Sequence, residues 1–239
     1  MSSQRKRAVA AVVSATALGA GAWLVGPASA TTAAAPAAAP AAAPAEVAAA
    51  SSVHPASHGS AVRTARLETL NNSGARGSGR VSVAVNGTKL KVEVQAGGFL
   101  LNRPHAMHIH WGSNSKGQCP TVRQDRNRDH RLNVVEGVPM YGPVALSLTT
   151  SGDTSPKSAL AVGRFPKAPR GLINYSRSEI PVGRALAAAI TRGDAVVVIH
   201  GLDYNQNLSY DFRGAGRSEL NPALPAEATD PNSCGVLHR

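Results

Sequence analysis

The sequence is poor in aromatic residues, with three Phe, two Trp and four Tyr among 239 residues. Acidic residues are also few, since 14 Asp and Glu stand against 25 Lys and Arg, and the formal net charge is +11. A basic chain attracts anions, which include small substrates, acidic cell walls and nucleic acids. Because no aromatic residues that could stack on bases are interleaved with the basic ones, we expect no nucleic-acid partner.

Cysteine is nearly absent as well, because Cys119 and Cys234 are the only two in the chain. They lie far apart and form no CxxC motif, which disfavours a thiolate metal site but leaves it open as an alternative. In an oxidising compartment, the simplest arrangement of an even pair is one disulfide.

Long apolar runs are missing beyond the first 25 residues. A basic stretch at 5–7, an apolar run at 8–25 and the small-residue triplet at 28–30 are typical of a secretory signal peptide that is cleaved after residue 30. A membrane anchor is the alternative, but the apolar run is short and rich in Ala and Gly. We therefore expect a signal peptide at 1–30, a secreted, extracellular mature protein, and no membrane span.

Residues 31–60 are almost wholly Ala, Pro, Ser and Thr. This composition cannot bury enough apolar surface to offset the entropy of ordering, so it predicts a disordered linker. Residues 61–239 are enough for a single domain with its own core.

Strand patterns dominate this domain. Val81, Val83 and Val85 alternate with polar residues before an Asn86-Gly87 turn, and alternation resumes after it, which predicts a β-hairpin. We expect further strands at 62–70, 105–110, 144–148 and 195–200, and one helix at 182–191 that ends at Gly193. Short strands with Gly- and Pro-rich connections indicate an all-β fold, an antiparallel barrel or sandwich.

Two histidines lie two residues apart in the strand predicted at 105–110. On a strand, the side chains of His108 and His110 leave the same face. Two imidazoles on one rigid face make half of a nitrogen-ligated transition-metal site.

Four segments resemble landmarks of the copper/zinc superoxide dismutase family. Residues 105–110, H-A-M-H-I-H, are similar to its H-G-F-H-V-H-x-x-G motif, with a Gly at 112, and Cys119 follows at the spacing of its first disulfide cysteine. Residues 196–201, V-V-V-I-H-G, resemble its V-V-V-H strand, and 233–237, S-C-G-V-L, resemble its A-C-G-V-I-G terminus. The resemblance implies a Greek-key β-barrel of superoxide dismutase type with long loops over 61–239, and a Cys119–Cys234 disulfide.

The same resemblance implies a copper site. It makes His108, His110 and His200 the copper ligands and places His105 beside them as a residue that supports the ligands. The family's zinc histidines have no counterparts, because 120–143 contains only His130, so we expect no zinc and take His130 as a candidate fourth copper ligand. Pro231 replaces the arginine with which the family steers superoxide.

Residues 125–136 have the spacing of an EF-hand calcium loop. The predicted oxygen ligands, by position in the loop, are Asp125, Asn127, Asp129, the backbone of Arg131, and Glu136. His130 stands at the sixth position, where the turn requires a positive φ and Gly is usual. The alternative is a polar surface loop whose acidic residues pair with the neighbouring arginines.

Three functional hypotheses follow. The first is a secreted, copper-dependent superoxide dismutase that converts superoxide to oxygen and hydrogen peroxide, with a calcium loop in place of the zinc loop. The second is a copper-holding module without turnover. The third is a secreted structural domain, since the chain also resembles CHRD domains, whose strands carry a similar A-H-I-H segment.

Overall fold

The computed structural model describes residues 61–72 and 79–238. The predicted signal peptide at 1–30 and the predicted linker at 31–60 lie outside this part of the chain. Within the described ranges, no helix is long and apolar enough to cross a membrane.

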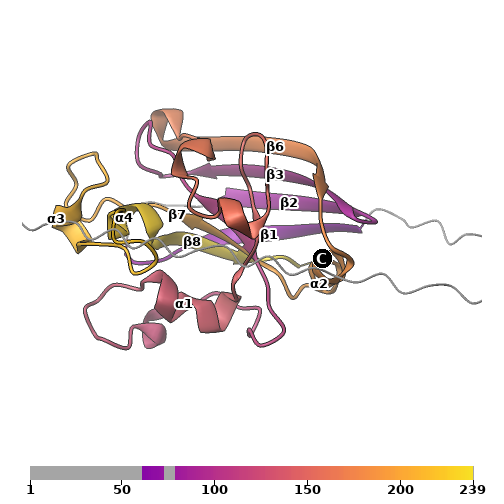
Figure 1. Cartoon of the computed structure of the whole chain (residues 1–239), viewed down its shortest axis with the longest axis horizontal. Helices are drawn as coiled ribbons and strands as arrows, with labels where there is room; N and C mark the ends of the chain where they lie inside the picture. Colours follow the sequence, from indigo (N-terminus) through magenta and orange to yellow (C-terminus); the bar gives the residue numbers. More distant parts are fainter. Residues whose placement is uncertain (1–60, 73–78, 239) are drawn as a thin grey trace, which may run out of the picture. The chain divides into compact units, whose positions relative to one another are not determined.

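The described part is mostly sheet. Eight antiparallel strands form one sheet in the order β5-β4-β7-β8-β1-β2-β3-β6, and the sheet curls into a half-barrel (Figure 1). The strands are β1 Ala61–Thr69, β2 Gly79–Asn86, β3 Lys89–Gly97, β4 Met107–His110, β5 Val144–Ser147, β6 Leu172–Pro181, β7 Val196–His200 and β8 Pro231–Val236. The prediction of an all-β, antiparallel fold is therefore confirmed at this level.

The hairpin predicted around residue 86 is present as β2 and β3. Buried and exposed residues alternate along β3, as its apolar pattern requires. Asn86 pairs with Lys89, so the two residues of the turn are Gly87 and Thr88, one residue later than expected. Gly87 has a φ of 58°, a conformation that glycine adopts without steric cost.

One of the two middle strands of the sheet is β8, which pairs with β7 on one side and β1 on the other. It therefore joins a group of three strands (β5, β4 and β7) to a group of four (β1, β2, β3 and β6). Side chains of β6 also reach the end of β5. The Tyr175 hydroxyl and the Arg177 guanidinium donate to the carbonyl of Thr149, at 3.2 and 2.7 Å. These bonds draw the two edges of the curled sheet together.

The two faces of β4 and β7 pack against different clusters. Met107 and Ile109 point into the main core between the curled strands. On the other face, Val196 and Val198 pack with Tyr141 in a smaller cluster. The histidines of β4 alternate with Met107 and Ile109, so they lie on this second face, which the loops and short helices outside the sheet cover.

The helices are short and lie outside the sheet (Figure 1). They are α1 Val134–Tyr141, α2 Arg184–Arg192, α3 Phe212–Ala215 and α4 Ala226–Thr229, with 3₁₀ turns η1 Val122–Gln124, η2 Pro156–Ser158, η3 Val162–Arg164 and η4 Pro169–Gly171. The helix α2 corresponds to the one predicted at 182–191, and it ends at Gly193 as expected.

The helix α1 was not predicted, because its first residues were assigned to the end of the calcium loop. Asn133 and Glu136 form a capping box at its start. The Asn133 side chain accepts from the Glu136 amide at 3.0 Å, and the Glu136 carboxylate accepts from the Asn133 amide at 3.1 Å. The Asn-x-x-Glu spacing was the sequence signal that could have revealed this helix.

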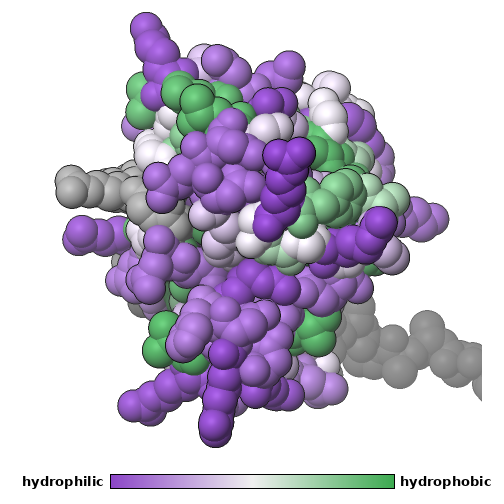
Figure 2. All heavy atoms as spheres, turned by 90° about the vertical axis from the view of Figure 1, so that its left-hand side faces the viewer, coloured by the Kyte–Doolittle hydropathy of each residue, from purple (hydrophilic) through white to green (hydrophobic). Residues whose placement is uncertain are grey.

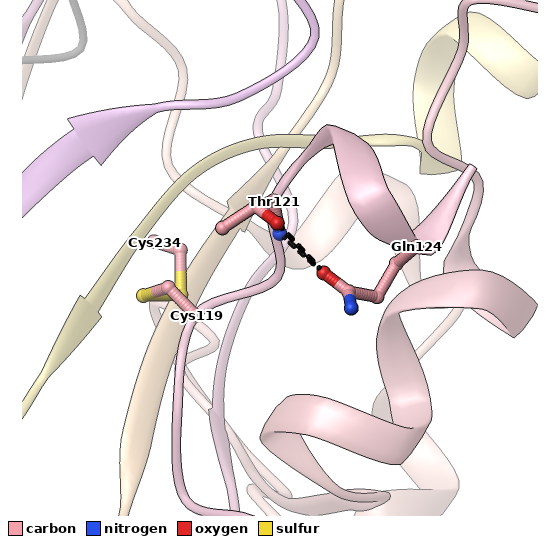
Figure 3. Close-up of a disulfide and its surroundings, with 4 residues drawn as sticks. All are labelled: Cys119, Thr121, Gln124 and Cys234. Atoms are coloured by element: carbon pink, nitrogen blue, oxygen red, sulfur yellow. Dashed lines mark hydrogen bonds between the residues drawn. A yellow bond between two sulfur atoms is a disulfide. The ribbon is translucent and has the colours of Figure 1, made fainter.

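Cys119 and Cys234 form a disulfide across a separation of 115 residues, so the predicted pairing is confirmed. Cys234 is buried in β8, whereas Cys119 begins the segment that leads to α1 (Figure 3). Two residues later, the Thr121 amide donates to the Gln124 side chain at 2.7 Å and caps η1. The disulfide thus anchors the start of this segment to β8.

The end of the domain that carries α3 and α4 faces the viewer in Figure 2. Hydrophilic side chains cover most of this face, and apolar ones form separate groups among them. The chain around these helices contributes three exposed apolar residues, Leu208, Phe212 and Leu220.

Candidate metal centre

Three histidines from the neighbouring strands β4 and β7 converge on the face opposite the main core. The ring centroids are 5.0 Å apart for His108 and His200, 5.6 Å for His108 and His110, and 6.1 Å for His110 and His200. One nitrogen from each ring lies within 4.8 Å of the other two. The structure therefore brings together the three side chains that the sequence predicts as ligands of one ion.

A backbone carbonyl fixes the orientation of each ring. His108 Nε2 bonds the carbonyl of Ala159 at 3.1 Å, His110 Nδ1 that of Gly142 at 2.9 Å, and His200 Nδ1 that of Thr229 at 2.6 Å. A carbonyl only accepts, so each of these nitrogens carries the ring proton. The tautomer of each neutral ring is thereby determined.

The other nitrogen of each ring then carries a lone pair. These atoms are His108 Nδ1, His110 Nε2 and His200 Nε2, and all three are buried without a hydrogen-bond partner. A buried acceptor without a partner destabilises a protein unless something else uses its lone pair. Three such nitrogens directed to one place are the donor set of a transition-metal site, so the residues fit a metal ion.

The three carbonyls come from three different segments outside the sheet. Gly142 ends α1, Thr229 ends α4, and Ala159 follows η2. Gly142 has a φ of 91°, and a Cβ there would lie 2.9 Å from Ser115 Oγ, so the position requires glycine. Sequence reasoning missed all three residues, because a backbone carbonyl gives no signal in the side-chain pattern.

His105 lies beside the cluster and does not join it. Its Nδ1 is 2.9 Å from the carbonyl oxygen of His200, and its Nε2 is 3.3 Å from that of Leu100. The ring is fully buried and stacks edge-on with Phe99. Because it holds the backbone of one histidine of the cluster, its position agrees with the supporting role that the resemblance implies.

The electrostatic surroundings keep the three rings neutral. Burial lowers the pKa of His110 to about 3 and that of His200 to about 4. Burial, together with the charged forms of His200 and His110, holds the pKa of His108 well below its usual range. The hydrogen bonds to the carbonyls act in the opposite direction and are weaker. Neutral imidazole is the form that binds a metal, so the cluster is ready to bind one at pH 7.

A small apolar cavity of about 30 Å³ adjoins the cluster, large enough for a water-sized ligand. The three histidines share its wall with Ala106, Val134, Val144, Ala159, Leu160, Val162, Leu220, Ala228 and Thr229. None of these lining residues is Asp, Glu, Lys or Arg.

Two further residues, His130 and Pro231, bear on the copper site predicted from the sequence. His130 is exposed and does not belong to the histidine group, so the interpretation of His130 as a fourth ligand is corrected. It lies on the predicted calcium loop, where it lines a groove with Cys119 and Asp125. Pro231, in place of the family's arginine, pairs with His200 in the sheet and presents no cation there.

The predicted calcium loop is ordered by its own hydrogen bonds. The Asp125 carboxylate accepts from the amides of Arg128 and His130, at 2.7 and 2.9 Å. Glu136 Oε1 accepts from the amide of Arg126 at 2.9 Å, and its Oε2 binds the cap of α1. His130 has the positive φ expected at the sixth position, 64°. Among the described residues, Asp125, Asp129 and Glu136 do not form a close ligand group like that of the histidines.

Arg131 ties this loop to the segment that orients His200. Its guanidinium contacts the Asp230 carboxylate, which is fully buried, at 2.7 Å. It also contacts the partly exposed carboxylate of Glu219, at 2.8 Å. The Tyr204 hydroxyl also donates to Asp230, at 3.0 Å. Asp230 directly follows the carbonyl that holds His200, so one ion-pair network joins the loops around the site.

The sequence matches no protein-family model and no curated protein at a significant level.

Proposed function

We propose that this chain is a copper-binding protein with a Greek-key barrel of copper/zinc superoxide dismutase type, and that His108, His110 and His200 hold the ion. The observation that supports it best is the set of three buried nitrogens without partners, each on a ring held by a carbonyl. Copper is preferred because an all-imidazole site of low coordination suits it, and because the sequence motifs resemble those of a copper family.

Superoxide dismutation is the activity we propose for the copper form. Bound copper would supply one-electron chemistry, taking an electron from one superoxide to release dioxygen and returning it to a second, which takes up two protons to leave as hydrogen peroxide. The protein's own contribution is to hold three neutral rings in fixed orientations and to limit the space beside them to a small ligand. Export by the signal peptide and calcium binding by residues 125–136 belong to the same proposal.

A second candidate function is copper holding without turnover. It is favoured by the cavity, whose lining carries no charged side chain, and by Pro231 in place of an arginine. Superoxide is an anion, and its capture gains from positive charge near the metal.

Metal analysis of the full chain, followed by a superoxide assay, tests both functions. We expect one copper per chain in the wild type and none in the double variant His108→Ala/His110→Ala. His130→Ala is the matched control, because this histidine is exposed and lies outside the cluster. Copper with turnover supports the dismutase and copper without turnover supports the holding module. Absence of copper would refute both and favour the CHRD-like structural domain.

A further inference from the structure

Two leucines that line the cavity beside the histidines are also exposed to solvent. Leu160 and Leu220 both line the cavity, and they are also 38% and 47% exposed. Leu160 follows η2, whereas Leu220 lies between α3 and α4. They therefore approach the cavity from two separate loops, with one side on the cavity and the other on solvent.

Two charged groups near these leucines in the sequence, Glu219 and Arg164, are bound elsewhere, and Lys157, three residues before Leu160, is exposed and does not line the cavity. Glu219 pairs with Arg131 at 2.8 Å. Arg164 donates to the carbonyls of Ser151 and Asp153, at 2.8 and 2.7 Å, and to Ser158 Oγ at 3.0 Å. Neither of these two charges lines the cavity.

We propose that Leu160 and Leu220 form an apolar gate that admits small uncharged ligands to the metal and disfavours anions. An anion that enters must give up hydration, and apart from the bound ion itself the cavity offers no charged group in exchange. A small neutral molecule loses much less hydration free energy on entering. The inference rests on the copper-binding part of the proposed function, and it predicts that superoxide, as an anion, reaches the copper slowly.

The test uses the copper-loaded full chain and two probes that differ in charge. Carbon monoxide, the neutral probe, is titrated into the reduced form and followed by infrared absorption. Azide, the anionic probe, is titrated into the oxidised form and followed by electron paramagnetic resonance. We expect Leu160→Lys and Leu220→Lys each to raise the azide affinity about tenfold, because each places a cation at the entrance, and to leave carbon monoxide affinity unchanged.

Leu172→Lys is the matched control, since this leucine on β6 is 45% exposed and does not line the cavity. Equal azide affinities in the wild type, both gate variants and this control would overturn the gate, as would a parallel rise in carbon monoxide affinity. Failure of the wild type to take up copper would appear in the metal analysis before any probe is added. That result would refute the proposed function, and the gate with it.

Discussion

Three buried lone pairs make the metal-free protein sensitive to acid. The pKa values of His110 and His200 are lowered to about 3 and about 4, and that of His108 is also lowered, by burial above all. In the unfolded chain, histidine titrates near its ordinary pKa of about 6.5. Below that pH the unfolded chain therefore binds more protons than the folded one, and the free energy of unfolding falls as the pH drops from about 6.5 towards about 4.

We predict a loss of up to about 1.4 kcal/mol per histidine for each pH unit in this window. Urea denaturation of the metal-free protein at pH 7 and pH 5 measures it. Copper-loaded protein should lose as much per pH unit, because its rings, like those of the metal-free protein, bind no protons in this window, but it starts from a higher free energy of unfolding. A free energy of unfolding that is the same at both pH values would contradict the prediction.

The second prediction at the scale of single residues concerns the buried carboxylate of Asp230. Arg131→Ala removes its ion-pair partner, and we expect the free energy of unfolding to fall by about 3 kcal/mol, because the Asp230 carboxyl, whose pKa burial raises to about 7, loses the cation that stabilises its charged form. Chemical denaturation at pH 7 measures the loss. Adding Asp230→Asn to the variant should recover part of it, since the buried charge is then gone. A loss below about 1 kcal/mol would show that the pair contributes no more than a surface ion pair does.

The side chains of the candidate site were predictable, whereas their surroundings were not. Strand alternation indicates His108 and His110, and the resemblance of residues 196–201 to the V-V-V-H strand of copper/zinc superoxide dismutases indicates His200. The carbonyls of Ala159, Gly142 and Thr229 that orient the rings depend on how distant loops pack, which no local pattern records. For the same reason, the exposed position of His130 could not be foreseen.

At the scale of secondary-structure elements, periodicity predicted the regular strands well. The β2–β3 hairpin has strict alternation, and α2 has a clear end at Gly193. The helix α1 is different, because it contains Gly137 and Pro139, two poor helix formers. It is stabilised by its capping box and by the burial of Tyr141, so packing overrides its weak intrinsic propensity.

The side chain of Glu136 connects α1 to the preceding loop, so Glu136 is the residue whose replacement tests how both are held. Glu136→Ala removes acceptors for the amides of Arg126 and Asn133, and we predict a loss of about 2 kcal/mol in the free energy of unfolding. Thermal and urea denaturation with and without millimolar calcium measure it. Asp125→Ala is the companion variant, since Asp125 binds the loop amides but does not cap the helix.

If its own hydrogen bonds order the 125–136 loop, Glu136→Ala loses the same free energy of unfolding with and without calcium. If calcium orders it, the wild type is stabilised in proportion to RT ln(1 + [L]/Kd), and this gain disappears in both variants. A loss in Glu136→Ala below about 0.5 kcal/mol under either condition would contradict the role given to its carboxylate.

At the scale of the whole molecule, the disulfide joins distant parts of the chain. We predict that Cys119→Ser/Cys234→Ser lowers the free energy of unfolding by about 5 kcal/mol, the chain-entropy value for a bridge across 115 residues. Urea denaturation of the oxidised wild type and the double variant measures the difference. Wild type unfolded in the presence of a reductant should match the variant. Equal stability of oxidised wild type and variant would contradict the prediction.

The place of β8 between β7 and β1 has a consequence for the order in which the protein matures. Ribosomes make a chain from its amino end, so the seven other strands are made before β8, whereas a domain folds as a unit and needs all of them. Until then, β7 and β1 each keep one edge unpaired, and such edges invite pairing with other chains. The carbonyl of Thr229, which orients His200, is made only just before β8. The candidate metal centre is thus among the last features to be completed, so we expect an ion to enter a nearly finished protein rather than to start its assembly.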